Sequence, residues 1–187
     1  MERGEPGAAE ADFMQAIETS QRVGYRHGEA VYRMNLAILF IITNRLGEAL
    51  HAFEEAEEKY GALDNSRGRA LVLSNAAWLW HGLIGDDAKA TDQVAEALAI
   101  YKHIGDSRGI AQCHGLMGSL AGRSGDLDGG RTQFDEALRL TRLAEDAWLT
   151  AQALRELAAI ELENGAIDSG LEHILEAESI CRDYGMN

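Results

Sequence analysis

Four stretches of this chain share one pattern: NRLGEALHAFEEA at residues 44–56, GDDAKATDQVAEA at 85–97, GDLDGGRTQFDEA at 125–137 and GAIDSGLEHILEA at 165–177. Each begins with a residue type that tolerates a left-handed backbone, and a small, a larger apolar and a small residue follow five, nine and twelve positions later. The spacings of four and three place these three side chains on one face of a helix. The pattern therefore predicts stacked helical repeats, in which no unit buries its apolar face alone.

The final small residue of the pattern recurs in steps of 40, 41, 40 and 40 residues, at Ala16, Ala56, Ala97, Ala137 and Ala177. The turn residues twelve positions earlier are Gly4, Asn44, Gly85, Gly125 and Gly165. A second polar turn precedes the other helix of each unit, seen at residues 64–68 and 105–109, where the Asp, Asn and Ser side chains can cap the free amides of that helix. We predict a lone helix at 7–23 and hairpins at 26–60, 65–103, 107–143 and 146–184, within a single domain over residues 1–187.

Composition favours an all-α protein. The 187 residues are 46% hydrophobic, only 6% are aromatic, and there is one proline. The net charge of −14 opposes binding to nucleic acid and to anionic membranes, which requires clustered Lys and Arg. The longest apolar run, Leu36–Ile42, is far shorter than the roughly 20 residues of a membrane span. Cys113 and Cys181 form no paired motif, so we expect reduced thiols in a cytoplasmic protein.

The string Asn35–Phe40, followed by Asn44, Gly47–Ala49, Phe53 and Ala56, resembles a tetratricopeptide repeat (TPR). The third and fourth units show the same positions, whereas Trp78 in the second stands where that family has a small residue. The resemblance implies a right-handed α–α superhelix of antiparallel hairpins, with about nine helices. The period of 40 exceeds the common 34, and in this it resembles the lengthened repeats of bacterial transcriptional and signalling regulators. Residues 1–23 look like half a hairpin, and one hypothesis is that the chain is a segment of a longer protein.

The same resemblance implies a concave groove lined by the first helix of each hairpin, where a partner would bind. Carried over by the repeat register, the candidate partner-binding residues are Met34, Ile38, Ile41, Asn75, Leu79, Gln112, Ser119, Arg123, Gln152 and Arg155. One end of this row is apolar and the other is polar.

Two parts of the groove leave alternatives open. The helix near 26–43 is apolar on nearly all sides, so Met34, Ile38 and Ile41 are either buried against a neighbouring helix or form an apolar contact site. Arg123 and Arg155 could hold a carboxylate or phosphate, or could pair with a nearby acid such as Glu163. The acidic cluster Glu54, Glu55, Glu57 and Glu58 is most simply a solvated face.

No sequence motif points to catalysis. The six histidines form no HxxxH or HExxH pair, and no phosphate-binding loop or nucleophile elbow occurs. We expect no catalytic residues, no metal site and no cofactor. The leading hypothesis is a non-enzymatic scaffold that binds a peptide, a helix or a neighbouring domain in its groove, within or alongside a bacterial regulator. The alternatives are an effector-sensing domain that uses the same groove for a small molecule or peptide, and a self-association module that forms a homodimer.

Overall fold

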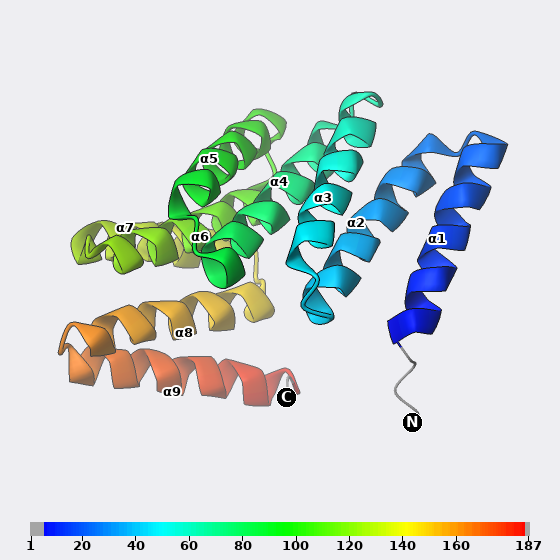
Figure 1. The fold of residues 1–187 in the computed structure, drawn as a ribbon. Coiled ribbons are helices and arrows are strands. Elements are labelled where there is room, and N and C mark those ends of the chain that lie inside the picture. The colour runs from blue at the N-terminus through cyan, green and yellow to red at the C-terminus, as the bar shows by residue number, and fades with distance from the viewer. Residues whose placement is uncertain (1–5, 186–187) are drawn as a thin grey trace. The chain divides into compact units, whose positions relative to one another are not determined.

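The computed structural model describes residues 6–185, which form helices joined by short turns and include no strand (Figure 1). The helices are α1 (Pro6–Val23), α2 (Arg26–Ile42), α3 (Leu46–Gly61), α4 (Ser66–Leu79), the π-helical turn η1 (Trp80–Ile84), α5 (Asp87–Ile104), α6 (Ser107–Ser124), α7 (Leu127–Leu143), α8 (Ala147–Glu163) and α9 (Ile167–Asp183). The predicted lone helix and the outer bounds of the four predicted hairpins lie within one residue of these bounds, and the all-α class is confirmed.

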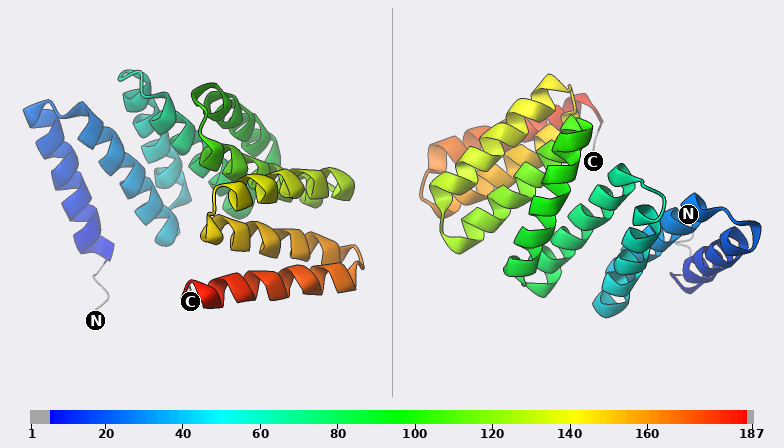
Figure 2. Two further views of the ribbon diagram at one scale, coloured as in Figure 1. Left: turned by 180° about the vertical axis from the view of Figure 1, so that it is seen from behind. Right: turned by 90° about the horizontal axis from the view of Figure 1, so that it is seen from above.

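Contacts between Cα atoms divide the chain into two compact units, unit 1 (Met1–Ile100) and unit 2 (Tyr101–Asn187). Within each unit the chain turns back after every helix, and α2 with α3, α6 with α7 and α8 with α9 are the most extensively packed pairs. Figure 2 shows α8 and α9 side by side along their length. The single domain over residues 1–187 stays a prediction.

Every turn between two helices contains one residue in the left-handed region. The predicted positions Asn44, Gly85, Gly125 and Gly165 have φ of 59°, 83°, 84° and 78°, and Gly4 lies outside the described residues. The turns that join one hairpin to the next use Gly24, Asp64, Gly105 and Glu145 in the same way. The recurring turn residues therefore end each helix at a fixed place along the chain.

Side-chain caps start five of the helices. In the two polar turns predicted to cap a helix, Asn65 and Asp106 accept hydrogen bonds from the backbone amides of Gly68 and Gly109, at 2.9 and 3.1 Å. Asp86, Asp126 and Asp146 do the same for α5, α7 and α8. Each cap satisfies an amide that has no partner inside its helix, which is typically worth about 1 kcal/mol.

The small, large, small face of each second helix is its buried face. Phe53, Val94 and Phe134 are at most 2% exposed, and the recurring alanines Ala56, Ala97, Ala137 and Ala177 are at most 1% exposed. Ile174 of α9, at the position of Phe134, is only half-buried. The packing predicted from the repeat is therefore present in α3, α5 and α7 and incomplete on the last helix.

A π-helical turn explains the one repeat step of 41 residues. The first helix of these hairpins has a buried glycine in its first turn and is followed by a left-handed turn residue. The two are 16 residues apart in two hairpins, Gly28 to Asn44 and Gly109 to Gly125. In the second hairpin they are 17 residues apart, Gly68 to Gly85. The extra residue falls in η1, where the helix widens by one residue per turn. Residues before η1 therefore align with the first hairpin at a spacing of 40, not 41.

This register corrects the expectation that Trp78 replaces the small residue of the family. Ala77 is fully buried, like Ala37 one repeat earlier and Ala158 two repeats later. Trp78 instead takes the half-buried position next to it, equivalent to Ile38. The second repeat thus keeps its small residue.

Candidate functional site

The first helix of unit 1's first hairpin, α2, divides its apolar residues between a core and a surface. Leu36, Ala37 and Phe40 are buried against α1 and α3. On the other side Ile38 is 39% and Ile42 is 74% exposed, while Met34 and Ile41 are half-buried against the edge of the core. Both alternatives therefore hold in part, because the helix is covered on one face and presents an apolar row on the other.

The corresponding helix of the next hairpin, α4, contributes a different residue from the one predicted. Leu79 is 2% exposed and belongs to the core of unit 1, so its assignment to the groove is wrong. The prediction counted back from Gly85 and therefore included the extra residue of η1. Trp78 is the half-buried residue at that register position, and Asn75 is also half-buried.

The π-helical turn is held in place by α5. His81 is 5% exposed, and its Nδ1 lies 2.8 Å from Asp87 Oδ1. The Lys89 ammonium group lies over the Trp80 ring, 4.1 Å from its centroid. These contacts fix the ring of Trp78, which packs edge-on to His81.

In unit 2 the predicted row is polar. Gln112 and Ser119 on α6 and Gln152 on α8 are half-buried, and Arg123 and Arg155 are exposed. Ser119 Oγ lies 3.4 Å from Glu156 Oε2 and so links the two helices. The Arg155 side chain makes no hydrogen bond or ion pair with any residue in 6–185, so the expected pairing with Glu163 is not formed in that range.

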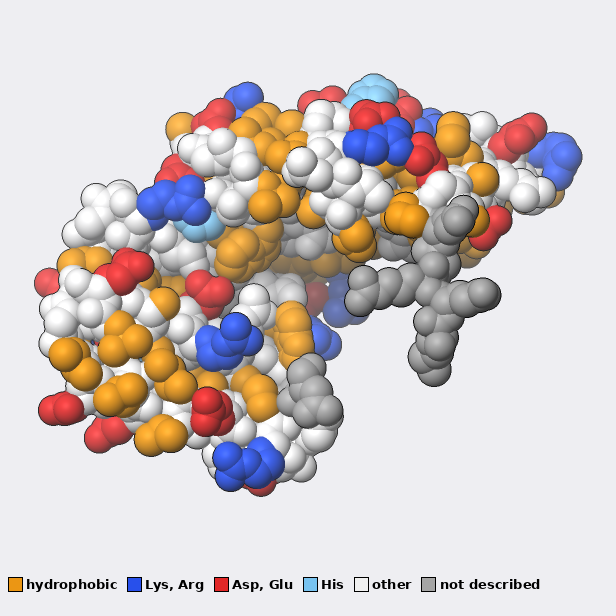
Figure 3. Space-filling view, turned by 60° about the horizontal axis from the view of Figure 1, so that its bottom comes forward, with side chains coloured by type: hydrophobic (Ala, Val, Ile, Leu, Met, Phe, Trp, Pro, Cys, Tyr) orange, Lys and Arg blue, Asp and Glu red, His pale blue; other side chains and the backbone are white. Residues whose placement is uncertain are grey.

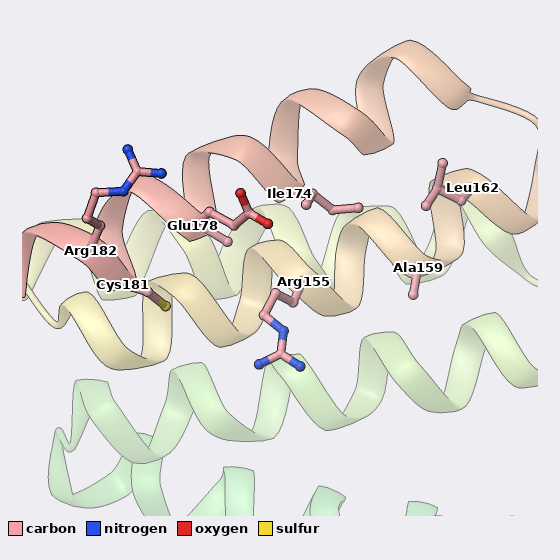
Figure 4. Close-up of a pocket in the computed structure, with 8 residues that line it drawn as sticks. Arg155, Ala159, Leu162, Ile174, Glu178, Cys181 and Arg182 are labelled. Carbon is pink, nitrogen blue, oxygen red and sulfur yellow. The ribbon is translucent and has the colours of Figure 1, made fainter. Parts of the chain in front are cut away.

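A pocket of about 740 Å³ lies beside Arg155, between α8 and α9 (Figure 4). Its walls are mainly apolar and carry charged groups at the edges. The lining residues are Arg155, Ala159, Leu162, Ile174, Ala177, Glu178, Cys181 and Arg182. The sequence analysis did not predict this pocket. The one signal in the sequence is that Arg182 lies one repeat period of 40 residues after Arg142.

The acidic cluster on α3 is only partly a solvated face. Glu54 and Glu58 are exposed, but Glu55 forms an ion pair with Arg33 and Glu57 one with Arg69, at 3.0 Å. Half of the cluster therefore joins α3 to its neighbours.

Two buried carboxylates that the sequence did not indicate join helices within a unit. Glu161 of α8 is 3% exposed, and Ser169 Oγ and His173 Nδ1 of α9 each lie 2.7 Å from one of its oxygens. Both groups bind the same carboxylate, so the imidazole does not stand between the hydroxyl and the acid as a nucleophile relay would require. The two contacts of Glu161 therefore hold α9 against α8.

Glu29 of α2 is the second buried carboxylate, 6% exposed. Its Oε1 accepts hydrogen bonds from Gln21 Nε2 at 2.9 Å and Arg33 Nε at 3.2 Å, and Lys59 Nζ lies 3.5 Å away. Burial by itself would raise the pKa of Glu29, but these hydrogen bonds and positive charges outweigh it and lower the pKa below 4.5. The ionised carboxylate therefore ties α1 and α3 to α2.

Removing the charge of Glu29 should make unit 1 less stable at neutral pH. Because the folded pKa is lowered, the stabilisation is present above the unfolded value of 4.5 and is lost as the pH falls through the folded pKa. Glu29→Gln should lower the free energy of unfolding by about 1–3 kcal/mol near pH 7, and this loss should shrink as the pH falls below 4.5. Urea titrations at a series of pH values from 7 downwards measure this, and a loss that does not change with pH would contradict it.

The remaining side chains give little sign of reaction chemistry. Cys113 is fully buried and burial raises its pKa to about 12, so it is an inert thiol. No group of three metal-binding side chains occurs among residues 6–185. No helix in that range is both long and apolar enough to cross a bilayer.

Comparisons with solved structures identify the type of fold. No family model and no curated protein matches the sequence. The crystal structure of BtubC (BKLC) from P. vanneervenii superposes with a TM-score of 0.80 over 98% of this chain and 76% of its own, at 18% identity. Two crystal structures of a putative kinesin light chain from Podosopora anserina with nearly identical TPR-like repeats, one of them of a variant, give TM-scores of 0.69 and 0.71 at 12% identity, over 98% of this chain and 90% of theirs. The chain therefore has a TPR-like helical-repeat fold.

Proposed function

We propose that this protein is a non-enzymatic scaffold that binds a helix or peptide of another protein through the exposed apolar row of α2. TPR-like repeats generally mediate protein–protein interaction. The observation that carries the proposal is the exposure of Ile38 and Ile42, at 39% and 74%, on a helix whose opposite face is fully packed. Burying an isoleucine side chain is worth about 1.5–3 kcal/mol, so this row favours an apolar partner.

The setting we propose is the cytoplasm, within or alongside a bacterial regulator. The unpaired thiols of Cys113 and Cys181 are consistent with a reducing compartment. The 40-residue period, longer than the common unit, supports the regulator context by resemblance.

The test is selection from a displayed library of random helical peptides, followed by affinity measurements on purified protein. Enriched peptides should carry an apolar stripe, and Ile38→Asp should weaken their binding by about tenfold or more. Leu143→Asp is the matched control, because Leu143 is 77% exposed but lies on α7. Binding that survives Ile38→Asp would contradict this site.

Light scattering over a range of protein concentrations separates self-association from partner binding. A dimer that Ile38→Asp abolishes while helicity is retained would make self-association the function of this row. Protection of α2 from hydrogen exchange by a metabolite would instead favour the effector-sensing alternative.

A further inference from the structure

The face formed by α8 and α9 is apolar and open to solvent. Leu162 is 37%, Leu171 49% and Leu175 64% exposed. Leu162 lines the pocket, and Leu171 and Leu175 lie on α9 within one turn of Ile174, which also lines it. Figure 3 shows hydrophobic side chains gathered over this end of unit 2, next to charged groups. Apolar side chains exposed together in this way mark a binding surface.

The preceding hairpin shows what such a face binds. In α6 and α7 the equivalent surface is covered by the next hairpin, and Ile160 of α8 packs where Gly122 and Gly130 leave room for it. At the edge of that contact, Arg142 of α7 donates to Glu176 of α9 at 2.7 Å. The surface of α6 and α7 thus receives an apolar side chain from α8 and a carboxylate from α9.

The repeat register places Arg182 on α9 where Arg142 stands on α7. Arg182 and Arg155 make no side-chain hydrogen bond or ion pair with any residue in the described range, and both are exposed. In Figure 4 the two guanidinium groups point away from each other, and Cys181 and the carboxylate of Glu178, which also lines the pocket, lie between them. Arg155 and Arg182 therefore both line the pocket without a carboxylate partner among residues 6–185.

We propose that the α8–α9 face binds an amphipathic helix of another protein whose apolar stripe is flanked by carboxylates. The apolar residues of that helix enter the pocket, and its carboxylates pair with Arg155 on one side and Arg182 on the other. The arginine fork suits a carboxylate. This face belongs to unit 2, whereas the row on α2 belongs to unit 1.

The probe is a pair of synthetic amphipathic helices about 18 residues long, one with leucines flanked by glutamates and the other with lysine at every glutamate position. The acidic peptide should bind about tenfold more tightly than the basic one, because two exposed ion pairs together contribute about that factor. It should also slow alkylation of Cys181, which lines the pocket, while the buried Cys113 stays unreactive in every sample.

The double variant Arg155→Glu, Arg182→Glu should reverse the preference, so that the basic peptide binds more tightly. Arg22→Glu is the matched control, because Arg22 on α1 is likewise exposed and unpaired among residues 6–185, and it should change nothing. Circular dichroism establishes that each variant is folded. Ile38→Asp should leave both readouts unchanged, which separates this proposal from that for α2.

Three results would overturn the proposal: equal affinity for the two peptides, an unchanged preference in the double variant, or no protection of Cys181. A fourth is a dimer, detected by light scattering without peptide, in which Cys181 is already protected. The occupant would then be a second copy of this chain.

Discussion

Replacing Phe134 by alanine should cost about 3–5 kcal/mol of stability, the largest effect that we expect from a single substitution. Its ring is fully buried in the core of unit 2, together with Leu154 and Leu157 of α8. Phe134→Ala removes this apolar area and leaves a cavity that the rigid helices around it can only partly fill. Urea unfolding followed by circular dichroism measures the loss.

Ile174→Ala is the matched control, since Ile174 holds the same repeat position on α9 and is only half-buried. It should cost about 1 kcal/mol, because little of its area leaves water on folding. Equal losses of stability would mean that Ile174 is buried as fully as Phe134, which would contradict the open α8–α9 face described above.

Gly118→Ala should destabilise the protein by about 1–3 kcal/mol, although alanine favours a helix. An added Cβ would lie 2.6 Å from Cε2 of Phe134, and that ring is fully buried. The ring or one of the two helices must therefore move. Thermal unfolding of the purified variant measures the cost.

Gly115→Ala, one turn earlier in α6, is the control with the opposite sign. An added Cβ there meets no atom within 4 Å. The substitution should therefore stabilise the helix by about 0.5–1 kcal/mol, since glycine loses more backbone entropy than alanine on folding. Destabilisation by both alanines to the same extent would contradict the close contact of α6 with α7.

The sequence predicted positions on the candidate site only where the repeat spacing holds no inserted residue. The repeat register placed Ile38 on the predicted groove face, and its side chain is 39% exposed. Leu79 was misassigned because the register applied the extra residue of the second repeat to every position in it. The structure confines that residue to η1, so the half-buried Trp78 takes the position equivalent to Ile38. A period counts residues along the chain and does not say where in a helix an extra one is accommodated.

The sequence by itself determined the helices, their ends and their pairing into repeats. These follow from interactions over a few residues: a left-handed turn residue such as Gly125, a cap such as Asp126, and the spacing of small and large side chains. The tertiary structure alone decided which charged groups are satisfied. Glu161 meets His173 across a hairpin, and Arg142 meets Glu176 of the following one, while Arg155 and Arg182 meet no carboxylate in the described residues. The energy of an ion pair depends on distances and burial between residues far apart in the sequence, and only the packed helices set these.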